Sequence, residues 1–144
     1  MEIEKLIKVL AKSVFKRPRR VESDVTWEPQ SKGGLIISHF HRRSKSLEAK
    51  GIDACQSGMM SDAYSLLTQA IEAAPQRPSC YNNRAQILRL QGRSDEALLD
   101  LDKALGLSGA RGRTGSQALV QRASIHRKDG REDDAIADFR VAIQ

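Results

Sequence analysis

Amide and basic side chains recur at helical spacing in three stretches of the chain, where they could together bind a peptide. Asn and Gln side chains can bond the backbone of an extended segment, and Arg and Lys can bind its carboxylates. Four of the ten candidates are positive and one is negative, so an acidic segment is expected; the alternative is a solvated polar face. The candidates are Lys45, Glu48, Asn82, Asn83, Gln86, Arg89, Gln117, Gln121, Arg127 and Lys128.

The sequence lacks the residue patterns of catalytic and cofactor-binding sites. It contains no glycine-rich phosphate loop, nucleophile elbow or paired histidine–carboxylate motif. Asp133 and Asp134 follow Gly130, where carboxylates stabilise a helix start through its dipole and its free N–H groups. His39 and His41 have no further metal ligand nearby in the sequence. We therefore expect no enzymatic activity, no cofactor and no metal.

The elements that position the candidates are pairs of amphipathic helices, each pair broken by a glycine. In the central copy, one apolar stripe ends before Gly92 and the next begins at Ala97. Glycine can adopt the positive φ that ends a helix. Gly58 precedes Gly92 by 34 residues, and Gly130 follows it by 38. Helical hairpins that recur with a period near 34 are typical of tetratricopeptide repeats.

Small residues recur where the paired helices would cross, and they would let the two helices approach closely. They are Gly51, Ala85 and Ala123 on the first helices, and Ala63, Ala97 and Ala135 on the second. The sequence therefore predicts an all-α, superhelical array of three helical-hairpin repeats, preceded by a partly disordered extension. A plain helical bundle is the alternative.

Several short motifs resemble the tetratricopeptide repeat protein 36 family. They are Tyr81–Gln86, Gln121–Ala123 and Gly130–Ala135, together with the extra residues around Arg111–Gly115. The resemblance runs from about Leu47 to Gln144. Because that family normally continues past this C-terminus, the resemblance implies a variant with a divergent N-terminus and a shortened C-terminus.

The resemblance also implies a partner, the 70-kDa heat-shock chaperone. Tetratricopeptide domains that hold the acidic tails of the 70- and 90-kDa chaperones use a carboxylate clamp of Lys, Asn, Asn, Lys and Arg. Only Asn83 matches this clamp, because the other four positions are Glu48, Ile52, Gln117 and Gln121. Any chaperone contact should therefore differ from the clamp, and affinity for a chaperone tail should be weak.

Charge separates an N-terminal extension from the repeats. We expect the extension at 1–43, the first repeat at 44–77, the second at 78–111, and a short insert with the third repeat at 112–144. The extension holds ten Lys and Arg against five Asp and Glu, whereas residues 44–144 hold fourteen against thirteen. The net charge of +6 therefore belongs mainly to the extension, and nucleic-acid binding is not expected.

The extension begins with apolar residues at helical spacing among lysines, which predicts an amphipathic helix from Glu2 to Lys16. A basic cluster at 16–20 could serve nuclear import or contact phosphates. The polar composition of residues 21–32 predicts a linker. Residues 33–38 could form a short strand, although the sequence offers no second strand to pair with it.

Several roles are open for the amphipathic helix. Basic amphipathic helices lie on anionic membranes, so peripheral membrane contact through residues 1–17 is one of them. A mitochondrial presequence is disfavoured by Glu2 and Glu4. The helix could also dock on the repeats, dock on another protein, or stay solvated.

The leading hypothesis is a non-enzymatic adaptor that binds a peptide or helix of another protein in a concave groove. The alternative is a scaffold or assembly factor, for example in organelle or cilium assembly, that is recruited by the basic N-terminal helix. Cys55 and Cys80 lack metal-ligand spacing, which suggests a reducing compartment. A cytoplasmic location is therefore expected, with the nucleus or a membrane surface as alternatives.

Overall fold

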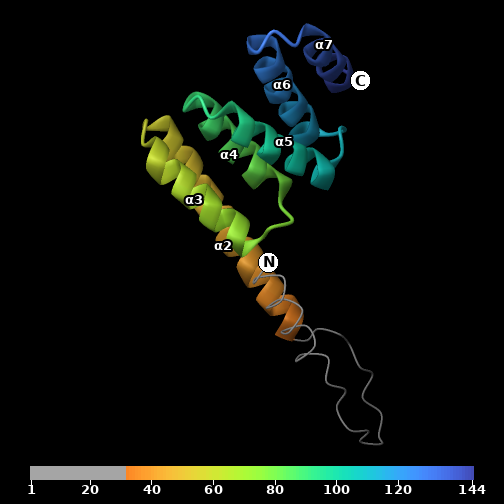
Figure 1. Ribbon diagram of the computed structural model, residues 1–144. Helices are drawn as coiled ribbons and strands as arrows, with labels where there is room; N and C mark the ends of the chain where they lie inside the picture. The colour runs from red at the N-terminus through yellow and green to blue at the C-terminus, as the bar shows by residue number, and fades with distance from the viewer. Residues whose placement is uncertain (1–31) are drawn as a thin grey trace, which may run out of the picture. The chain divides into compact units, whose positions relative to one another are not determined.

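A computed structural model describes residues 32–144 of the chain, and Figure 1 shows their arrangement. The predicted helix from Glu2 to Lys16, the basic cluster at 16–20 and most of the predicted linker lie outside the described residues. Contacts between residues divide the chain into two units, and the division falls between Arg42 and Arg43.

Within residues 32–144 the secondary structure consists of six α-helices, which confirms the prediction of an all-α array of helical hairpins. No helix in this range is both long and apolar enough to cross a membrane. The helices are α2 (Lys32–Gln56), α3 (Met60–Ala73), α4 (Pro78–Leu90), α5 (Ser94–Ser108), α6 (Arg113–Lys128) and α7 (Glu132–Ala142).

The helices of the repeat unit pack in the order in which they occur along the chain. Helix α4 packs against α5 and α6 against α7, while contacts of α3 with α4 and of α5 with α6 join one hairpin to the next. Helix α4 also contacts α6, so the first helices of the second and third repeats are neighbours (Figure 1). Side chains from these two helices can therefore line one common surface.

Small residues set the distance between the paired helices, as the sequence predicts. Ala63, Ala97 and Ala123 are completely buried. A Cβ atom added to Gly51 would lie 2.9 Å from Cγ of Leu67, so even a methyl group would force that leucine to move. Close helix packing therefore depends on these positions having little or no side chain.

A glycine with positive φ ends the first helix of each repeat. Gly92 has φ of +76°, and the N–H of Arg93 donates to the carbonyl of Leu88 at 2.8 Å. This backward hydrogen bond satisfies a carbonyl that the helix end would otherwise leave free. Gly58 and Gly130 repeat the arrangement with φ of +78° and +75°, so the predicted turns are confirmed.

We expect Gly92→Ala to lower the free energy of unfolding by about 1 kcal/mol, because a Cβ disfavours the left-handed backbone conformation. Gly92→Asn should cost less, since asparagine tolerates that conformation better. Urea unfolding of both variants measures the difference. Equal stability of the alanine variant and the wild type would contradict this account of the turn.

The prediction of a short strand at 33–38 is wrong, because these residues belong to α2, which begins at Lys32. An isolated strand would leave its backbone groups without a neighbouring strand. Extending an existing helix is easier, because each added residue gains a hydrogen bond without a new nucleation step. The β-branched side chains of Ile36 and Ile37 lower helix propensity too little to reverse this balance.

The extra residues between the second and third repeats form a tight turn rather than a loose insertion. Gly109 and Gly112 both have positive φ, and α6 begins immediately afterwards at Arg113. Gly115, in the first turn of α6, is buried against this turn. A Cβ on Gly115 would lie only 2.3 Å from the carbonyl oxygen of Gly109. The turn and the start of α6 therefore fit together only with glycine at 115.

Candidate functional site

Polar side chains from α4 and α6 line a shallow groove of about 380 Å³, here called the α4–α6 groove. The α4 side chains lie at positions i, i+1, i+4 and i+7, which places them on one side of that helix. The lining residues are Asn82, Asn83, Gln86, Arg89, Ser116, Gln117, Val120 and Gln121. Amides, a hydroxyl and one guanidinium therefore meet an apolar side chain in a single groove.

Six of the ten predicted binding residues lie in this groove: Asn82, Asn83, Gln86, Arg89, Gln117 and Gln121. Lys45, Arg127 and Lys128 are exposed and are not among its lining residues. Arg127 has the same place in the third repeat as Arg89 has in the second, yet only Arg89 lines the groove. The basic character of the groove therefore depends on Arg89.

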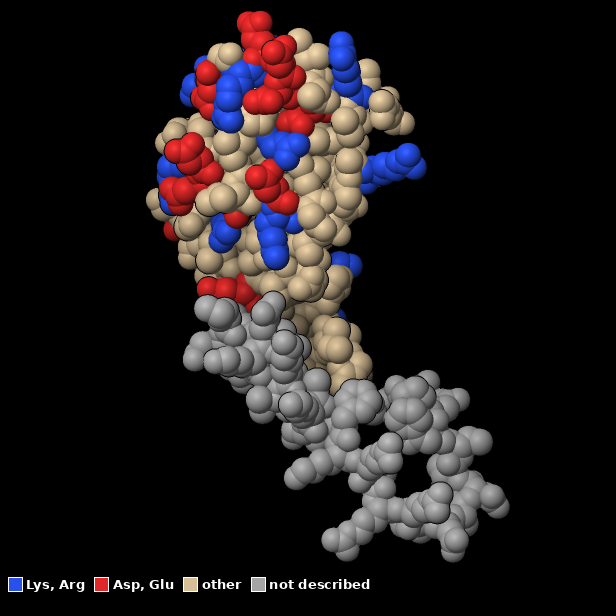
Figure 2. Space-filling model, turned by 45° about the vertical axis from the view of Figure 1, so that its right-hand side comes forward, with Lys and Arg blue, Asp and Glu red and all other residues tan. Residues whose placement is uncertain are grey.

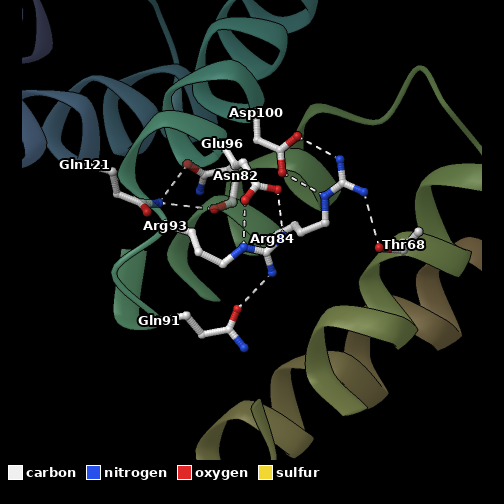
Figure 3. Close-up of polar contacts among 8 residues, drawn as sticks. All are labelled: Thr68, Asn82, Arg84, Gln91, Arg93, Glu96, Asp100 and Gln121. Atoms are coloured by element: carbon white, nitrogen blue, oxygen red, sulfur yellow. Dashed lines mark hydrogen bonds and ion pairs between the residues drawn. The ribbon is translucent and has the colours of Figure 1, made fainter. Parts of the chain in front are cut away.

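Gln121 connects the two helices across the floor of the groove. Its Nε2 donates to Oδ1 of Asn82 at 2.9 Å and also approaches the Asn82 carbonyl oxygen at 3.3 Å (Figure 3). Asn82 is 5% exposed, so this contact is shielded from water. The α4–α6 groove therefore has a preformed polar floor.

Two buried polar atoms of the groove have no hydrogen-bond partner among the described residues: Nε of Arg89 and Oε1 of Gln121. Most buried polar atoms in proteins are hydrogen-bonded, because leaving one unpaired is costly. Nε of Arg89 is a donor that would suit a carboxylate or carbonyl oxygen. Oε1 of Gln121 is an acceptor that would suit an N–H group. Because both atoms are buried, a ligand would pair with them only after the two side chains turn toward the groove.

Glu48, another of the ten predicted binding residues, is buried and is not among the residues that line the groove. It is 8% exposed, and its carboxylate accepts hydrogen bonds from Arg77 and, at 2.9 Å, from Nδ2 of Asn83. Arg77 lies in the α3–α4 connection, outside the repeating helical pattern, so the register did not indicate this pairing. The contact also engages the side-chain amide of Asn83, the one residue that matches the carboxylate clamp.

The same buried network explains the environment of Cys80. The Sγ atom of Cys80 lies 3.7 Å from Oγ of Ser44, which donates to the Ala70 carbonyl and accepts from Arg77. Burial, reinforced by the negative charge of Glu48, raises the pKa of the Cys80 thiol. Cys80 is therefore a packing residue that stays protonated at neutral pH.

Sequence reasoning missed two arginine–aspartate pairs. One joins the two helices of the second repeat, and the other joins the two helices of the third. Arg84 donates to Asp100 at 2.7 and 2.8 Å and to Thr68 at 3.2 Å (Figure 3). Hydrogen bonding to Asp100 raises the pKa of Arg84. Arg122 and Asp138 repeat the pair at 2.8 and 2.6 Å, with the same separation of 16 residues. That repeated spacing is the signal that could have revealed both pairs.

The charged surface of the repeats has no dominant sign. Figure 2 shows acidic and basic side chains interleaved over the visible face. Residues 44–144 carry fourteen Lys and Arg against thirteen Asp and Glu, so their net charge is close to zero. The field of the whole repeat unit therefore favours neither an acidic nor a basic ligand.

Sequence comparison agrees with the fold. A tetratricopeptide repeat family model matches residues 66–98. The protein named Tetratricopeptide repeat protein 36 of Bos taurus is 50% identical over 102 residues, which cover 71% of this chain and 54% of that protein. The Homo sapiens protein of the same name is 49% identical over the same coverage. The chain thus spans about half the length of the curated relatives it matches.

Solved structures with the same fold include peptide complexes. The second TPR of Spaghetti (RPAP3) bound to HSP90 peptide SRMEEVD has a TM-score of 0.67 and 21% identity, covering 74% of this chain and 94% of that one. The Arabidopsis OM64 TPR domain has a TM-score of 0.67 and 24% identity, covering 72% and 83%. At these identities the likeness concerns the fold alone.

Proposed function

Because this chain is a tetratricopeptide repeat protein, related in sequence to the proteins named Tetratricopeptide repeat protein 36, we propose that it is a non-enzymatic adaptor. Its function is to hold a short, extended, acidic segment of another protein in the α4–α6 groove. The described part of the chain supports this proposal through the polar lining of that groove.

The observation that carries the proposal is the pair of unpartnered atoms, Nε of Arg89 and Oε1 of Gln121. An extended peptide presents N–H donors and carbonyl acceptors along its backbone, and an acidic side chain adds a carboxylate. A backbone N–H would pair with Gln121, and a carboxylate would pair with Arg89. Such charge-assisted bonds are shorter and stronger than neutral ones, which accounts for the preference for an acidic segment.

The 70-kDa heat-shock chaperone is a candidate partner within this proposal. Solved domains of the same fold hold the acidic HSP90 peptide SRMEEVD, which supports an acidic chain end as the kind of ligand. In this chain Glu48 already engages the amide of Asn83, so a chaperone tail would have to use Arg89 instead. We therefore expect a dissociation constant above about 1 μM, a binding free energy weaker than about 8 kcal/mol.

A second role, as a scaffold or assembly factor recruited through the N-terminal region, is favoured by one observation. Large apolar side chains near the start of α2, including Leu35 and Ile37, are exposed. Both cysteines are free thiols, which supports a reducing compartment such as the cytoplasm for either role.

We expect Arg89→Glu to weaken binding of the peptide SRMEEVD at least tenfold, because the carboxylate partner would meet a like charge. Ten-fold corresponds to about 1.4 kcal/mol, the scale of one hydrogen bond to a charged group. Isothermal titration calorimetry measures the change, and circular dichroism verifies that the helices are retained.

Arg127→Glu is the matched control, because it makes the same charge reversal at an exposed position outside the groove. Its affinity should stay close to that of the wild type. Equal losses of affinity in the two variants would show that the peptide is attracted by the net charge of the protein rather than by a specific contact with Arg89. No loss in either would remove Arg89 from the binding site.

A further inference from the structure

The first part of α2 exposes four large apolar side chains, here called the α2 apolar ridge: Leu35, Ile36, Ile37 and Phe40. Leu35 and Ile37 are each 71% exposed, and Ile36 and Phe40 are 37% and 39% exposed. Scattered exposed apolar residues are ordinary, but four within six consecutive helical residues concentrate apolar surface on one short stretch of the helix. Such a patch indicates a surface that contacts something other than water.

The described residues nearest the α2 apolar ridge in the sequence carry no negative charge. Residues 32–42 contain Lys32, His39, His41 and Arg42 but no Asp or Glu. Over residues 1–43 the excess of Lys and Arg over Asp and Glu is five. The occupant of the ridge should therefore combine an apolar interior with a negatively charged surface.

From this combination we infer that the α2 apolar ridge lies on an anionic membrane surface. Helices that bind in this way sink their apolar side chains to the boundary between lipid headgroups and acyl chains. Their basic side chains remain among the anionic headgroups. Leu35, Ile36, Ile37 and Phe40 would supply the apolar contact, and the exposed Arg42 would contact the headgroups.

The geometry of the ridge distinguishes a membrane from a partner helix. Successive residues are about 100° apart around a helix, so Leu35 and Ile37 lie about 200° apart across the side that carries Ile36 and Phe40. One partner helix covers a narrower stripe than this. A membrane interface can bury a broad sector of a helix that lies in its plane.

Charge also disfavours two further occupants. A second copy of the chain would bring another basic ridge against the first. The amphipathic segment at 2–16 contains four lysines against two glutamates, so it too is net positive. An anionic lipid surface is the occupant that satisfies both the apolar and the electrostatic requirement.

Flotation of the full chain with lipid vesicles tests this inference. One set of vesicles contains phosphatidylcholine and phosphatidylserine in a three-to-one ratio, and the other contains phosphatidylcholine alone. The wild type should float with the anionic vesicles, remain behind with the neutral ones, and dissociate as salt concentration rises. Leu35→Gln with Ile37→Gln should lower the bound fraction about tenfold, because both changes remove apolar contact while glutamine still supports a helix.

Leu99→Gln is the matched control, since Leu99 is 70% exposed on α5 and undergoes the same chemical change. This variant should float like the wild type. A wild type that floats with neither set of vesicles would overturn the inference and favour an acidic protein helix as the occupant. Undiminished flotation of the double variant would also overturn it, because the contact would then lie outside the ridge.

Discussion

Replacing Gly115 by alanine is expected to lower the free energy of unfolding by about 3 kcal/mol, near the upper end of the usual cost of overpacking. The added Cβ would lie 2.3 Å from the Gly109 carbonyl oxygen and 2.8 Å from the carbonyl carbon of Ala110. These neighbours are backbone atoms, so a change of side-chain rotamer cannot relieve the contact. The turn between α5 and α6 would have to move, and the packing of the third repeat would move with it.

Gly106→Ala is the matched control, because a Cβ at this exposed position of α5 would meet nothing within 4 Å. It should raise stability by about 0.5–1 kcal/mol, since glycine is a poor helix former. Urea unfolding followed by circular dichroism compares the two variants. If Gly115→Ala proved as stable as the wild type, the tight turn would not constrain the start of α6.

The second large effect is expected at the ion pair between α4 and α5. Asp100→Ala would remove the principal hydrogen-bond acceptor of the Arg84 guanidinium. The Arg84 side chain is only 18% exposed, so water could not fully replace that acceptor. We expect the free energy of unfolding to fall by about 3 kcal/mol, which is the lower end of the usual cost of removing one partner of a buried ion pair. Thr68 also accepts a hydrogen bond from Arg84 but carries no charge to replace the carboxylate.

The combined variant Arg84→Met with Asp100→Leu should recover most of this loss, because apolar residues can replace a buried ion pair at little cost. Glu96→Ala is the control, since Glu96 pairs with Arg93 on the exposed surface and its removal should change stability little. Thermal unfolding of all three variants tests the argument. An Asp100→Ala loss no larger than that of Glu96→Ala would show that the Arg84–Asp100 pair is not part of the core.

The repeats could be predicted from the sequence because the features that define them are local. A glycine that ends a helix, such as Gly92, acts through its own φ angle. Small residues such as Ala97 and Ala123 recur at fixed offsets, so the helix crossings can be located without a structure. The same register identified six of the groove residues, because side chains four and seven positions apart share a helix face.

The pairing of Glu48 with Arg77 could not be predicted in this way. Glu48 has the register of a groove residue, yet Arg77 reaches it from an irregular connection 29 residues away. Hydropathy likewise does not indicate that Gly115 is buried against a turn, since this depends on the path of the chain between α5 and α6. The start of α2 was missed because local β-branched residues compete with a helix whose stability depends on the residues that follow.

Arg89 is the residue on which the groove and the proposed function depend together. It is the basic side chain among the eight residues that line the α4–α6 groove, and its Nε is buried without a partner among the described residues. Binding of an acidic ligand should therefore change the environment of the Arg89 Nε–H group more than that of any other arginine Nε–H group in the repeats.

The most direct test is nuclear magnetic resonance of the arginine Nε–H groups while the peptide SRMEEVD is added to the isotope-labelled full chain. We expect the largest shift at Arg89 Nε–H, together with shifts of the side-chain amides of Gln117 and Gln121. Arg84 and Arg122, which already donate to Asp100 and Asp138, should change little. Unchanged Arg89 and Gln121 resonances at saturating peptide, or shifts confined to Arg84 and Arg122, would contradict peptide binding in the α4–α6 groove.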